Sequence, residues 1–168
     1  RWLGLIGAIA FAFSSYNPIV ISAGHITKMI DIAYMPAVLA GIVWTLRGNY
    51  LGGAAFTAVV LAMFIDTGHY QVIYYLGLVI IVGVLAAGYY FYKAGKIKNW
   101  LIASSCLAIA AIFSVMANSS RFMETQAFSK HSIRGGQSEL TEGEGEKSTG
   151  LDRDYAFAWS NGIEETMN

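Results

Sequence analysis

The sequence predicts an all-α fold: a multi-pass transmembrane helical bundle of about five spans, with an extracytoplasmic, partly irregular C-terminal segment. Of its 168 residues, 55% are hydrophobic and only 13% are charged, whereas a soluble globular chain carries about 25% charged residues. The charge is also uneven. Residues 1–120 contain two carboxylates, Asp31 and Asp66, and all other acids lie in residues 121–168.

Five apolar stretches account for the expected spans. A helix needs about 20 residues to cross the bilayer core. The long runs show no strand alternation, so we expect helices, which pair their own backbone N–H and C=O groups inside the membrane. Two of the stretches fall short of that length and flank the tight connection Arg47-Gly48-Asn49, which predicts a helical hairpin. The first stretch is about half a span, so the chain is expected to be an internal piece of a longer protein. The stretches are 2–13, 32–46, 50–65, 72–92 and 99–118.

Basic residues fall at alternate ends of successive spans and predict the orientation. The positive-inside rule places such residues in the cytoplasm. They are Arg1, Arg47 and the cluster of Lys93, Lys96 and Lys98. The segments expected to be extracytoplasmic are the loops 14–31 and 66–71 and the tail 119–168.

The chain is therefore expected to have two regions, a transmembrane region over 1–118 and an extracytoplasmic segment over 119–168. Residues 137–150 read QSELTEGEGEKSTG, which is acidic, glycine-rich and almost without apolar side chains. Such a composition cannot bury enough surface to order itself, so a mobile loop is expected there. Apolar residues alternate again over 155–159, which indicates a segment lying on the membrane surface.

Both histidines and both carboxylates of residues 1–120 lie in the two outer loops. Ionisable residues near membrane depth are costly and are functional candidates, so His25, Asp31 and Asp66 are weak candidates for catalysis. Structural alternatives exist: Lys28 could extend to the interface, Asp31 could pair with Lys28, and the histidines could be structural. Imidazole and carboxylate also suit divalent ions. The spacing matches no ligand motif, so no metal ligand is assigned and a divalent cofactor stays open.

The tail offers one phosphate-binding candidate. Arg134 stands beside Gly135 and Gly136, and a guanidinium fork with neighbouring backbone N–H groups can hold a phosphate. A solvated basic loop is an equal alternative. No Walker loop, GxSxG elbow, HExxH or CxxC pattern is present, so nucleotide hydrolysis, serine hydrolysis and zinc proteolysis have no support. The single cysteine, Cys106, allows no disulfide within the chain.

Four motifs follow one another along the chain: GHITKMIDIAYMP (24–36), GHYQVIYYL (68–76), SIRGGQSELT (132–141) and GLDRDYAFAWSNGIEET (150–166). In this order they resemble the bacterial YfhO family of membrane proteins, and most closely its long Bacteroidetes-type members. That family is similar in architecture to the GT-C glycosyltransferases. These are multi-pass enzymes that take sugar from a polyprenyl-phosphate donor on the outer face of the membrane.

The resemblance implies a segment of a GT-C-like glycosyltransferase in the bacterial cytoplasmic membrane, acting on a cell-envelope acceptor. Its partners would be membrane lipid and the polyprenyl-phosphate sugar donor, with no nucleic acid. The expected substrate- or phosphate-binding residues are Lys28, His69, Gln71 and Arg134. The residues that the resemblance marks are His25, Thr27, Lys28, Tyr34, Pro36, His69, Gln71, Arg134, Gly135 and Ser138.

Two rival interpretations stay open. A GT-C catalytic acid usually lies in a first outer loop, ahead of the part present here, so the fragment is expected to lack it. A non-enzymatic membrane subunit, packing with other membrane subunits in a larger complex, is therefore the main alternative. A transporter is disfavoured because few charges line the spans and no inverted repeat is present.

Overall fold

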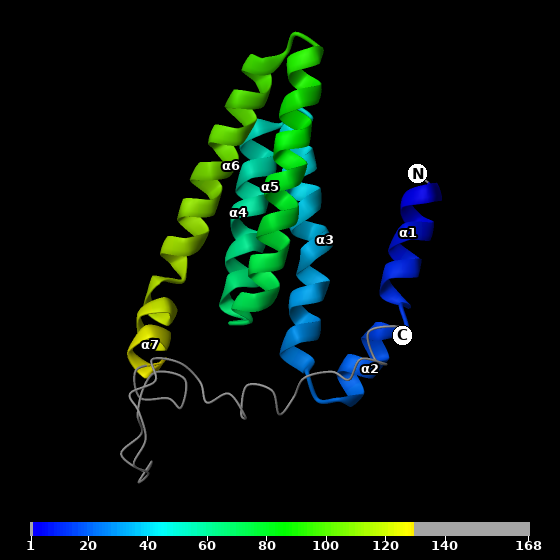
Figure 1. The fold of residues 1–168 in the computed structure, drawn as a ribbon, viewed down its shortest axis with the longest axis vertical. Coiled ribbons are helices and arrows are strands. Elements are labelled where there is room, and N and C mark those ends of the chain that lie inside the picture. Colours follow the sequence, from blue (N-terminus) through cyan, green and yellow to red (C-terminus); the bar gives the residue numbers. More distant parts are fainter. Residues whose placement is uncertain (1, 130–168) are drawn as a thin grey trace, which may run out of the picture. The chain divides into compact units, whose positions relative to one another are not determined.

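The computed structural model describes residues 2–129, and within that range the chain is helical without any strand (Figure 1). The contacts divide the chain into two units, Arg1–Ser119 and Ser120–Asn168, and each is described by itself. The second unit contributes most of one short helix to the described range. In chain order the helices are α1 (Trp2–Ala12), α2 (Tyr16–Ser22), α3 (Ile26–Leu46), α4 (Tyr50–Asp66), α5 (Tyr70–Lys93), α6 (Ile97–Ala117) and α7 (Ser119–Ser129).

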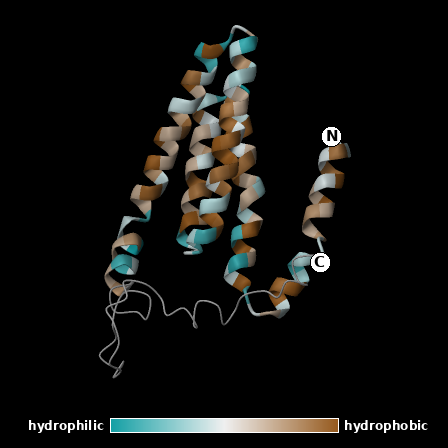
Figure 2. Ribbon diagram, viewed as in Figure 1, coloured by the Kyte–Doolittle hydropathy of each residue, from teal (hydrophilic) through white to brown (hydrophobic). Residues whose placement is uncertain are grey.

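Four helical stretches of the described residues are long and apolar enough to cross a membrane. They are Trp2–Ser22, which includes α1 and α2, and the helices α3, α5 and α6. Helix α4 is apolar but has 17 residues, so it is shorter than these four. Hydrophobic residues fill the middle of α3 to α6, and hydrophilic ones gather toward their ends (Figure 2). The predicted all-helical, multi-span character is confirmed for the described residues.

The prediction that residues 14–31 form an outer loop is wrong. Residues 16–22 form α2, and α3 begins at Ile26, so Asp31 lies in the second turn of a helix instead of in a loop. The polar residues Lys28 and Asp31 made this segment resemble a connection. The helix extends through them, and Asp31 is buried there with its carboxyl group accepting a hydrogen bond from Thr67.

Glycines with positive φ end the helices at both ends of the bundle. At the end of α5, Gly95 has φ 69°, its N–H donates to Tyr92 O, and the N–H of Lys96 donates to Phe91 O at 2.8 Å. Gly24 ends α2 in the same way, with φ 81°. This pair of bonds is the Schellman motif, whose left-handed position favours glycine because it has no Cβ.

Helices α3 and α4 form the predicted hairpin, and they pack through a reciprocal pair of glycine and threonine. Gly41 of α3 lies against Thr57 of α4, and Gly53 of α4 lies against Thr45 of α3. Each threonine hydroxyl donates to the glycine carbonyl one turn earlier in its own helix, at 2.8 Å for Thr45 and 2.7 Å for Thr57. The missing side chains therefore allow the two backbones to approach closely.

A polar side chain of α6 and that of the residue directly after this helix bind the backbone of α4. Ser114 Oγ lies 2.9 Å from Ala58 O, and Asn118 Nδ2 donates to Ala62 O at 3.1 Å. Both side chains are buried. In a membrane, interhelical hydrogen bonds and close packing replace the hydrophobic effect as the forces that join helices. The apolar core of α3, α4 and α5 consists of Val38, Ile42, Val60, Phe64, Val72 and Leu76.

The turns of this unit lie at two ends of the bundle. The α3–α4 turn with Arg47 and the α5–α6 turn with Lys96 line one pocket, so these turns share an end, which we call the basic end. The α2–α3 and α4–α5 turns share the other end, because a hydrogen bond joins Thr27 to His69. We call it the polar end. Arg47 and Lys96 thus lie together, as the alternation of spans requires.

Candidate functional site

The start of α3 and the turn between α4 and α5 meet in a cluster of four polar residues, which we call the polar cluster. Thr27 and Asp31 are four residues apart on α3, so they lie one turn apart on the same face. Thr67 and His69 flank the α4–α5 turn. Thr27 Oγ1 and His69 Nε2 form a hydrogen bond of 2.7 Å, and the Thr67 hydroxyl donates to Asp31 Oδ1. Two side-chain bonds therefore tie the first turns of α3 to the next hairpin.

Asp31 is the most unusual member of the polar cluster. Its side chain is 0% exposed, although it stands in a helix that can span a membrane. Its Oδ2 atom has no hydrogen-bond partner in the described part of the chain. Buried polar atoms in proteins nearly always have a partner, and an ionisable residue inside a membrane segment indicates a functional site by default. Asp31 is thus a stronger candidate than its sequence context suggested.

Thr67 positions this carboxyl group. It follows the last residue of α4, and its hydroxyl oxygen also lies 2.7 Å from Phe64 O. One hydroxyl hydrogen thus faces two acceptors. His69 precedes α5 and is half-buried, so its ring is reachable from outside the bundle, whereas Asp31 is not.

The structure places the other predicted site residues at the same end. Lys28 is half-buried in the first turn of α3, and His25 is exposed just ahead of that helix. Asp66 ends α4 and is exposed. Gln71 is exposed, and its side-chain amide donates to the phenol oxygen Oη of Tyr75 at 3.3 Å, one turn along α5.

Other predictions receive no support from the described residues. The donor to Asp31 is Thr67 and not Lys28. Among residues 2–129, no three of the His, Cys, Asp and Glu side chains come together as they would around a metal ion. The proposed grouping of two histidines with two aspartates is therefore not formed there. Arg134, Gly135 and Ser138 lie outside the described residues.

Sequence reasoning missed Thr67 altogether. Its signal was its place in the run Asp66-Thr67-Gly68-His69, where Gly68 has φ 85° and turns the chain back into α5. A threonine beside such a turn directs its hydroxyl toward nearby groups, but only the fold shows that Asp31 is one of them.

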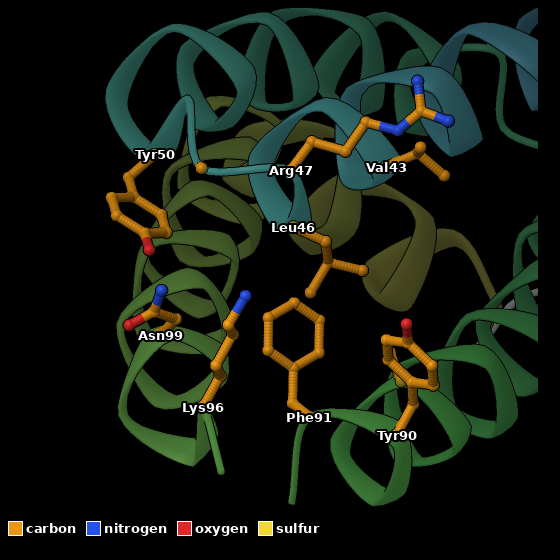
Figure 3. Close-up of a pocket in the computed structure, with 10 residues that line it drawn as sticks. Val43, Leu46, Arg47, Tyr50, Tyr90, Phe91, Lys96 and Asn99 are labelled. Carbon is orange, nitrogen blue, oxygen red and sulfur yellow. The ribbon is translucent and has the colours of Figure 1, made fainter. Parts of the chain in front are cut away.

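A pocket lies at the basic end of the same bundle. It is a pocket of about 450 Å³ lined by residues of α3, α4, α5, α6 and their connections (Figure 3). It contains none of the residues predicted from sequence as substrate-binding. The lining residues are Val43, Leu46, Arg47, Gly48, Tyr50, Ala87, Tyr90, Phe91, Lys96 and Asn99.

Comparison with protein-family models, with curated proteins and with solved structures finds no match for this chain. The resemblance to the YfhO family accordingly stays a prediction that depends on the four sequence motifs.

Proposed function

We propose that this chain is a segment of a GT-C-like membrane glycosyltransferase that takes sugar from a polyprenyl-phosphate donor on the outer face of a bacterial cytoplasmic membrane. The observation that supports it best is the polar cluster. Thr27 and Asp31 belong to one motif, His69 belongs to a second motif and Thr67 directly precedes that second motif, yet the four residues share one end of an otherwise apolar bundle. That end is opposite the basic end, so the positive-inside rule places it outside.

Within this proposal Lys28 binds the donor phosphate. It stands on the same turn as Thr27 and is half-buried, so its apolar stem can lie along α3 while the ammonium group reaches the surface. Glycosyl transfer leaves a phosphate that requires a cation, and such fixed charges act strongly where water is excluded. His69, held by Thr27, is the polar partner that a substrate hydroxyl would meet first.

Asp31 acts indirectly in this proposal. A side chain that is 0% exposed cannot touch the sugar or the acceptor in this conformation. Its bond from Thr67 fixes the α4–α5 turn that carries His69. Asp31 is thus a positioning residue, and the catalytic acid belongs to another part of the enzyme.

The alternative is a non-enzymatic membrane subunit, in which the polar cluster only clamps α3 to the α4–α5 turn. The test is sugar transfer from a polyprenyl-phosphate donor by the full-length protein, at matched expression. Lys28→Gln should lower turnover about 10- to 150-fold, because a hydrogen bond to a charged group contributes about 1.5–3 kcal/mol. Lys28→Arg should keep part of the activity, since charge remains but its geometry changes.

The matched control is Lys93→Gln, which removes a lysine from the basic end and should leave turnover unchanged. Full turnover by Lys28→Gln would refute the phosphate role. Two results together would instead favour the alternative. The protein would show no transferase activity, and substitution of Lys28 or His69 would only cause a partner subunit to be lost on purification.

A further inference from the structure

The pocket at the basic end has the composition of an anion site. Two of its lining residues, Arg47 and Lys96, are cationic, and none of the ten is acidic. The two carboxylates of residues 1–120 are Asp31 and Asp66, which both lie at the polar end. The positive charge of the pocket therefore has no counter-charge among the residues that line it.

Apart from these two cations, most residues that line the pocket are apolar or aromatic. Figure 3 shows Phe91 and Leu46 facing each other across the pocket and Lys96 extending between Asn99 and Phe91, whereas the guanidinium group of Arg47 is directed away from Lys96, on the side of Val43. Tyr50 and Tyr90 contribute hydroxyl groups at its sides. A volume of about 450 Å³ falls within the range of sites that hold small ligands, about 300–1,000 Å³.

The position of the pocket identifies the kind of anion. It lies where α3 ends and α6 begins, at the ends of two helices long enough to span a membrane. Lipid headgroups occupy this depth, and basic pockets between transmembrane helices commonly bind anionic headgroups. The first-turn N–H groups of α6 follow Lys96, whose side chain makes no capping bond, and they add a partial positive charge.

We propose that this pocket binds the phosphate group of one anionic phospholipid from the surrounding leaflet. Lys96 holds the phosphate, and the exposed Arg47 side chain turns from the conformation in Figure 3 to bind it as well, while the acyl chains lie against the apolar outer surface of the spans. This site is separate from the polar cluster, so the inference does not depend on the proposed glycosyltransferase activity.

The experiment is native mass spectrometry of the purified protein in detergent, titrated with phosphatidylglycerol or with phosphatidylcholine. We expect one phosphatidylglycerol to be retained in preference. The double variant Arg47→Gln/Lys96→Gln should weaken that binding about 25-fold, because each cation near the headgroup contributes about fivefold. Both side chains are exposed, so the substitutions remove no buried contact.

The control is Lys93→Gln/Lys98→Gln, which removes the same charge from the same end but from outside the pocket lining. It should retain phosphatidylglycerol almost as the unchanged protein does. Equal loss in the two double variants would show a general surface attraction and overturn the site. Equal binding of the two lipids would overturn it as well.

Two further experiments test whether the lipid lies in the pocket and whether the bound phosphate belongs to a lipid. Ala87→Phe fills the pocket without changing any charge and should also lose the lipid, and unchanged retention by this variant would count against the pocket. Inorganic phosphate at millimolar concentration should not displace phosphatidylglycerol. Complete displacement would show that the pocket takes soluble phosphate and would refute the lipid source.

Discussion

At the scale of single residues, a purely structural role does not explain Asp31, because its carboxyl group is buried and yet incompletely hydrogen-bonded. It is buried inside a helix that is long and apolar enough to span a membrane, and only one of its two oxygens has a partner among the described residues. Burying a carboxylate is costly unless both oxygens are satisfied. The sequence indicated that Asp31 was special because it is one of two acids in 120 residues. It could not indicate burial, because the partner Thr67 is 36 residues away.

Asp31→Asn should keep or raise the thermal stability of the protein. The asparagine retains an oxygen that can accept from Thr67, and it removes the cost of a buried carboxylate. Asp31→Leu should lower the stability by about 1 kcal/mol, the usual contribution of one hydrogen bond. The measurement is thermal unfolding in detergent. A marked loss of melting temperature in the asparagine variant would mean that the charge itself stabilises the fold.

At the scale of helices, the small residues of α3 and α4 decide how closely the hairpin packs. The sequence predicted the hairpin, because two apolar stretches flank the tight connection Arg47-Gly48-Asn49. It did not indicate Gly41, whose role depends on facing Thr57 across the interface. The start of α3 was misplaced for a related reason. Polar residues within a span resemble a loop until their partners on another helix are known.

Gly53→Ala should destabilise the hairpin by about 1–3 kcal/mol, the usual cost of overpacking. A Cβ at this position would lie 2.6 Å from Thr45 N, which is backbone and cannot move aside cheaply. Gly83→Ala in α5 is the control, because its Cβ would meet nothing within 4 Å. It should stabilise the protein by up to about 1 kcal/mol. Equal unfolding temperatures for the two variants would contradict the close packing of α3 on α4.

At the scale of the whole first unit, both carboxylates of residues 1–120 lie at one end of the bundle. The cations Arg47 and Lys96 lie at one end, and Asp31 with His69 lies at the other. The sequence could predict this separation because each turn of the bundle follows a recognisable apolar run. The contacts within the two ends could not be predicted, since both the polar cluster and the pocket are assembled from turns far apart in the chain.

The orientation of these ends is the central claim, because an enzyme using an outer-leaflet donor requires the polar end outside. Two exposed alanines offer a matched pair, each preceding a glycine of positive φ: Ala23 at the polar end and Ala94 at the basic end. In a Cys106→Ala background, Ala23→Cys should react with a membrane-impermeant thiol reagent in intact cells. Ala94→Cys should react only after permeabilisation. Labelling of Ala94→Cys but not Ala23→Cys in intact cells would contradict the account.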